Sequence, residues 1–80
     1  MMRTIRKPRL TARDRRILEA ARALPQCDML FNRNRSAIMS VEKLGWMVSA
    51  VERHLEGAID QDDICHGFAK LSAAGEISLW

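Results

Sequence analysis

Hydrophobic residues recur at helical spacing in three separate stretches of the chain. The clearest repeat advances in steps of three, four, three and four residues and comprises Val41, Leu44, Val48, Val51 and Leu55. This spacing places the five side chains on one side of an α-helix and predicts one buried stripe. Ser40 before the repeat is a favourable N-cap, and Gly57 after it is a common helix stop.

Two shorter helices are predicted on either side of this one. The first begins at Thr11, where Asp14 three residues later resembles a capping box with Asp in place of Glu. It ends at Pro25, because the residue before a proline avoids the α conformation. The last is capped by Asp60 and stops at Gly75. The apolar positions are Ile17, Leu18, Ala21 and Leu24 in the first helix and Ile64, Phe68 and Leu71 in the last.

The segments outside these helices predict a small amount of β structure. Residues 37–39 are predicted to form a short strand, and residues 76–80 alternate between polar and apolar positions as a terminal strand would. The remainder of residues 26–39 is predicted to be irregular, with an exposed loop at residues 32–36. We therefore expect a mainly α fold of three helices with a small two-stranded β element.

The length of the chain allows one hydrophobic core. With 80 residues it lies below the usual domain size of about 100–150, and 48% of its residues are hydrophobic, as in globular proteins. Residues 1–10 are basic and contain Pro8, so we predict a flexible basic arm followed by a single compact domain at residues 11–80. Domains this small often gain stability from a second copy, so a homodimer is among the expected assemblies.

Charge divides the chain into a basic half and an acidic half. The formal net charge is +3. Residues 1–40 contain ten basic and three acidic residues, a net +7, whereas residues 41–80 contain three basic and seven acidic residues, a net −4. A basic region of this kind favours a polyanionic partner, and the opposite charges also allow head-to-tail self-association.

No catalytic or metal-binding pattern can be identified, so we expect neither an enzyme nor a cofactor. Cys65 and His66 are adjacent and would point about 100° apart on a helix, which argues against a zinc site and against a Cys–His nucleophile. The carboxylates of Asp60, Asp62 and Asp63 lack the glycine and terminal Glu of a calcium loop and are interpreted as helix-capping residues.

Cysteine content and hydropathy predict a cytoplasmic protein. Cys27 and Cys65 are too few for a disulfide framework, and we expect both to be reduced and buried. No apolar run approaches the roughly 18–20 residues of a membrane span, so no membrane partner is expected. The polar residues 11–16 stand where the hydrophobic region of a secretory signal would follow a basic start.

One apolar pattern in the last third of the chain is similar to a known family. Spacers of three, two, three and one residues separate Ile64, Phe68, Leu71, Gly75 and Ile77. This pattern resembles the third helix and first wing strand of winged helix-turn-helix domains, and the preceding elements follow the order of that family over about residues 11–80. The resemblance implies a three-helix core with a small sheet, and it suggests a DNA-binding regulatory protein of bacterial or mobile-element origin.

The expected DNA contacts follow from the resemblance and from charge. In that family the third helix usually enters the major groove, and its outward face here would present Asp62, His66, Lys70 and Ala73. The carboxylates that begin this helix would be repelled by the phosphates, so electrostatics favour the basic arm and the first helix instead. The nucleic-acid-binding residues predicted on this basis are Arg3, Arg6, Lys7, Arg9, Arg13, Arg16, Arg33 and Arg35. The same bases would also suit a solubilising tail or an acidic protein surface.

The alternative function is that of a small phage-type inhibitor or adaptor, such as an anti-CRISPR protein, that docks on a larger protein complex. Trp46 lies roughly opposite the stripe of its helix, where it is either packed under the loop or arm or exposed as an interface anchor. The residues predicted for this protein interface are Trp46, Arg53, Asp62, Asp63, His66, Lys70 and Trp80.

Overall fold

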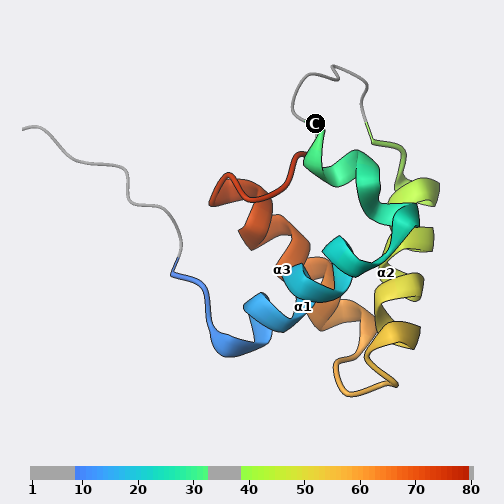
Figure 1. Ribbon diagram of the computed structural model, residues 1–80, viewed down its shortest axis with the longest axis vertical. Helices are drawn as coiled ribbons and strands as arrows, with labels where there is room; N and C mark the ends of the chain where they lie inside the picture. The colour runs from blue at the N-terminus through green and yellow to red at the C-terminus, as the bar shows by residue number, and fades with distance from the viewer. Residues whose placement is uncertain (1–8, 33–38, 80) are drawn as a thin grey trace, which may run out of the picture.

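The structure, a computed structural model, describes residues 9–32 and 39–79. This part of the chain contains the α-helices α1 (Ala12–Ala23), α2 (Val41–His54) and α3 (Gln61–Ala73), and the 3₁₀ helix η1 (Pro25–Phe31). Helix α3 packs against both α1 and α2, and η1 contacts α1 and α2. Figure 1 shows α2 along one side of the molecule, α1 and α3 crossing on its inner side, and residues 77–79 returning to η1.

The three predicted α-helices are confirmed, and each begins at its predicted cap. The Thr11 hydroxyl accepts from the Asp14 N–H, and the Asp14 carboxylate accepts from the Thr11 N–H, so the capping box is complete with Asp in place of Glu. The hydroxyl of Ser40 and the carboxylate of Asp60 accept from the backbone three residues later and begin α2 and α3.

The core lies where the three helices meet. Ile17 of α1, Val51 of α2 and Phe68 of α3 are fully buried. At Gly67, α1 and α3 approach so closely that an added Cβ would lie 2.6 Å from Ile17 Cδ1. A side chain at position 67 would therefore require the buried Ile17 side chain to move, so the packing at this point favours glycine.

The predicted two-stranded β element is wrong, because the described residues contain no strand. Residues 77–79 belong to no helix or strand; the Ser78 N–H donates to the Leu30 carbonyl at 2.6 Å, whereas the Met39 N–H donates to the Leu79 carbonyl at 3.3 Å. A β ladder needs repeated bonds between the same two segments, and here the two bonds go to different ones. Ile77 and Leu79 are nevertheless buried, so the alternation identified the inward side chains. Residues 37 and 38 of the other predicted strand lie outside the described residues.

Most of the segment predicted to be irregular is the 3₁₀ helix η1. Pro25 suits its first turn because the proline ring fixes φ and the missing N–H would have no partner there. Cys27 and Leu30 are both fully buried, and their three-residue spacing is the period of a 3₁₀ helix. The apolar pair at i and i+3 was the sequence signal for this element.

The two cysteines differ in exposure, so the prediction that both are buried is wrong for Cys65. Cys27 is fully buried, and this burial, together with the neighbouring Asp28 carboxylate, raises the pKa of its thiol. Cys65 is exposed, because the buried stripe of α3 follows Ile64 and Phe68 and leaves position 65 outside it. No helix of the described residues is long and apolar enough to cross a membrane.

This difference predicts selective alkylation. In the folded protein, iodoacetamide is expected to modify Cys65 and to leave Cys27 unmodified, because a buried thiol with a raised pKa supplies little accessible thiolate. Mass spectrometry should show one adduct on the native chain and two adducts after denaturation. A Cys65→Ser variant should show no native adduct, and rapid alkylation of that variant would contradict the buried position of Cys27.

Candidate nucleic-acid interface

The outward side of α1 carries two arginines that have no ion-pair partner in the part of the chain that the structure describes. Because Asp14, Ile17 and Leu18 face the core, Arg15 and Arg16 between them project into solvent. Arg9, which precedes the helix, is also exposed. Among the described residues, no carboxylate forms a salt bridge with any of these three arginines.

Two further arginines extend this surface and are held by weak contacts. Arg13 lies 3.4 Å from a carboxylate oxygen of Asp63, and both side chains are about half exposed. Arg22 lies 3.6 Å from Glu76 and places its guanidinium 5.7 Å from the centre of the Phe31 ring. Exposed pairs of this kind contribute about 0–1 kcal/mol, so an incoming phosphate can compete for both arginines. We call the exposed set Arg9, Arg13, Arg15, Arg16 and Arg22 the α1 surface.

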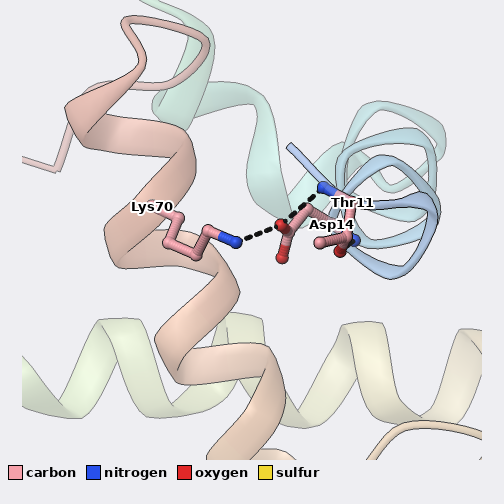
Figure 2. A network of polar contacts seen from close by, with 3 residues as sticks. All are labelled: Thr11, Asp14 and Lys70. Atoms are coloured by element: carbon pink, nitrogen blue, oxygen red, sulfur yellow. Dashed lines mark hydrogen bonds and ion pairs between the residues drawn. The ribbon is translucent and has the colours of Figure 1, made fainter. Parts of the chain in front are cut away.

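A buried ion pair fixes the start of α1 against α3. The Lys70 ammonium donates to Asp14 Oδ2 at 2.7 Å, and the Thr11 N–H donates to the same oxygen at 2.9 Å (Figure 2). The Asp14 side chain is only 3% exposed, whereas Lys70 remains 39% exposed. The pair ties the N-terminal turn of α1 to the third turn of α3.

The charge of Asp14 is stabilised by these contacts. Burial raises the pKa of the carboxyl, but the bond from Lys70, the backbone and side chain of Thr11 and the positive charge of Lys70 together outweigh burial. The pKa of Asp14 therefore lies below its ordinary value of 3.8. The carboxylate remains ionised at neutral pH, and Lys70 is committed to it and is not available to a ligand.

A shallow hollow lies beside the unpaired arginines. It has a volume of about 280 Å³ and is lined by Leu10, Arg15, Leu18, Glu19, Arg22 and Glu76. The hollow is lined by Glu19 and Glu76 as well as by Arg15 and Arg22. Because both signs of charge are present, it is not a pocket specific for an anion.

The residues predicted for a protein interface that the structure describes lie on α2 and α3, and two of them pair with residues of α1. Trp46 and Arg53 are exposed on α2, and Asp62 and His66 are exposed on α3. Asp63 and Lys70 instead turn towards α1, where they pair with Arg13 and Asp14. Of the two alternatives for Trp46, the exposed one holds, because 66% of the residue is accessible.

Several predicted residues lie outside the described part of the chain. They are Arg3, Arg6, Lys7, Arg33 and Arg35 of the nucleic-acid set and Trp80 of the protein-interface set.

Two arginines of the α1 surface were missed from the sequence. Arg15 could have been found by projecting α1 onto a helical wheel, because it lies beside Arg16 on the side opposite Ile17 and Ala21. Arg22 could have been found in the same way, because it follows Arg15 by seven residues and lies on the same side of the helix. Its contacts with Glu76 and Phe31 could not have been predicted, because they depend on how the other segments pack against α1.

A search for metal-binding groups and comparisons with known proteins gave no further indication of function. Within residues 9–32 and 39–79, no group of three or more His, Cys, Asp or Glu side chains could hold a metal ion. Comparisons of the chain with protein-family models, with curated proteins and with solved structures gave no match. The functional argument therefore rests on the side chains described above.

Proposed function

We propose that this protein binds nucleic acid, preferably duplex DNA, through the α1 surface. The observation that carries the proposal is that Arg9, Arg15 and Arg16 are exposed and lack a carboxylate partner among the described residues. Guanidinium groups on one helix suit a phosphate backbone, because each offers several donors to phosphate oxygens and neutralises a charge.

The distribution of charge supports this choice of surface. The acidic residues of α1 are Asp14, which is buried and paired with Lys70, and Glu19. The sequence adds Arg3, Arg6 and Lys7 ahead of Arg9, and contains no acidic residue before Asp14. A ligand that approaches the start of α1 therefore meets positive charge from the helix and from the residues that precede it.

Helix α3 is a weaker candidate for the DNA contact. Its outward positions include Asp62 and His66, and the side chain of Lys70 is held by Asp14. A phosphate backbone would meet the carboxylates of the first turn with no free lysine beside them. The proposal is accordingly for backbone binding by α1, which is independent of base sequence, and not for reading of bases by α3.

Charge reversal on α1 tests the proposal. Arg15→Glu and Arg16→Glu are each expected to weaken binding to a labelled DNA duplex of about 20 base pairs by roughly tenfold, because each removes a charged contact of about 1.5–3 kcal/mol. Fluorescence anisotropy at about 50 mM salt gives the dissociation constants.

A matched control separates the α1 surface from net charge. Lys43→Glu on α2 changes the net charge by the same amount, and Lys43 has no ion-pair partner among the described residues. This variant should bind within about twofold of the natural protein. Equal loss in all three variants, or no binding by the natural protein at low salt, would rule out the proposed surface.

A further inference from the structure

Helix α2 presents large apolar side chains to solvent. Val41 is 87% exposed, so the prediction that it belongs to the buried stripe is wrong for this residue. Trp46 is 66% exposed, and these two are the exposed large hydrophobic residues of the described chain. Figure 1 shows α2 at one edge of the molecule, away from the residues that lead into α1. An exposed tryptophan on a regular helix is typical of a surface that is covered in an assembly.

The outward face of α2 has the spacing of a helix-pairing seam. Glu42, Trp46, Ser49 and Arg53 follow one another at steps of four, three and four residues, which is the repeat of two helices packed side by side. Glu42, Trp46 and Arg53 are exposed, and Ser49 is partly covered by Gln61, whose side-chain amide lies 3.5 Å from its hydroxyl. We call these four residues the α2 seam.

The α2 seam is complementary to itself in the antiparallel direction. With a two-fold axis midway between Trp46 and Ser49, each Trp46 faces Ser49 of the second copy, and each Glu42 faces its Arg53. Glu42 and Arg53 have no salt bridge within the described chain, so both are available for such pairs. A parallel arrangement would instead place like charges opposite each other, which disfavours it.

Gly45 beside the seam gives an independent reason for close approach. A glycine inside a helix lowers helix stability by about 1 kcal/mol relative to alanine. A Cβ added at Gly45 would meet nothing within 4 Å among the described residues, so the packing that the structure describes does not require this glycine. The missing side chain instead leaves room for a neighbouring helix on the outward side of α2.

We infer that α2 is the contact surface of a homodimer in which the α2 helices of two copies pack antiparallel across the α2 seam. The interface is isologous, since the same four residues are used by both copies. It lies away from the start of α1, so a dimer presents two α1 surfaces together. The inference concerns a different helix face from the nucleic-acid proposal and does not depend on it.

One helix of 14 residues limits the strength of this contact. A pair of such helices buries less than the roughly 1,200 Å² of most stable interfaces, so a dissociation constant on the order of 10–100 µM is expected. Light scattering or sedimentation equilibrium of the full chain should therefore show a mass that rises from 9.1 kDa towards twice this value as the concentration increases through that range.

Charge exchange tests whether Glu42 and Arg53 form the contact between the two copies. Glu42→Arg gives a seam with two bases and Arg53→Glu gives one with two acids, so each variant alone is expected to dimerise at least tenfold more weakly. An equimolar mixture of the two variants should dimerise again, because both ion pairs are restored across the antiparallel contact. Glu19→Arg on α1 is the control and should dimerise like the natural chain.

Two results would overturn the inference. The first is a mass of 9.1 kDa for the natural protein at every concentration up to about ten times the expected dissociation constant. The second is that the natural protein dimerises but the equimolar mixture of Glu42→Arg and Arg53→Glu does not. Circular dichroism of each variant confirms that the helices remain folded, so that loss of association is not loss of structure.

Discussion

Replacement of Gly67 by valine is expected to lower the free energy of unfolding by about 2–3 kcal/mol. The new Cβ would lie 2.6 Å from Ile17 Cδ1 and 3.7 Å from the Asp14 carboxylate, where α1 and α3 meet. Ile17 is fully buried, so it cannot yield without disturbing its own neighbours. A core of this size supplies roughly 3–5 kcal/mol in total, so this single change removes a large share of the stability.

The matched control is the same substitution at Gly45. Both glycines lie inside an α-helix, but no atom of residues 9–32 or 39–79 is within 4 Å of an added Cβ at Gly45. Gly45→Val should therefore be neutral or slightly stabilising, because valine has a better helix propensity than glycine. Urea denaturation followed by circular dichroism at low protein concentration compares the two variants. Equal effects at the two positions would mean that α1 and α3 do not make the close contact described.

The second large effect is expected from Lys70→Met, which leaves the buried Asp14 carboxylate without its cation. Loss of one partner from a fully buried pair costs about 3–5 kcal/mol. Lys70 is 39% exposed, and the Thr11 N–H still donates to Asp14, so we expect a smaller loss of about 2 kcal/mol. Lys43→Met on α2, where the lysine has no ion-pair partner in the described chain, should change the stability by less than about 0.5 kcal/mol.

The pH dependence of the stability lost in Lys70→Met shows whether the ion pair is its cause. The pKa of Asp14 is lowered in the folded protein, so its stabilisation is present above the ordinary value of 3.8 and is lost as the pH falls through the lowered folded value. The difference in unfolding free energy between the natural protein and Lys70→Met should therefore narrow as the solution is acidified below about pH 4. A difference that stays constant with pH would assign the effect to lost packing and not to the ion pair.

The three α-helices could be predicted because their determinants are local. Thr11, Ser40 and Asp60 each cap the helix that follows, and the apolar repeats lie within the same segments. The conformation of the terminal segment was not predictable in this way. The alternation of Ile77 and Leu79 reported which side chains turn inward, but the hydrogen bonds of the Ser78 and Leu79 backbone, to Leu30 and Met39, are set by the tertiary fold.

For the candidate site, too, the features set by neighbouring residues could be predicted and those set by tertiary contacts could not. The basic character of residues 9–16 is visible in the sequence, and so is the outward position of Arg16 on the predicted helix. The sequence does not show which of the basic side chains form ion pairs with carboxylates. Lys70 pairs with Asp14 from 56 residues away, and Arg13 pairs with Asp63, so only the fold shows that Arg15 and Arg16 remain without a carboxylate partner in the described chain.

The dependence of DNA affinity on salt tests the central claim most directly. Each phosphate contact contributes about −0.9 to the slope of the logarithm of the association constant against the logarithm of the salt concentration. The natural protein should give a slope of about −3 or steeper, and the double variant Arg15→Glu/Arg16→Glu should give a slope shallower by about 2. Identical slopes for the two proteins, or an affinity of the natural protein that does not change with salt, would contradict binding through the α1 surface.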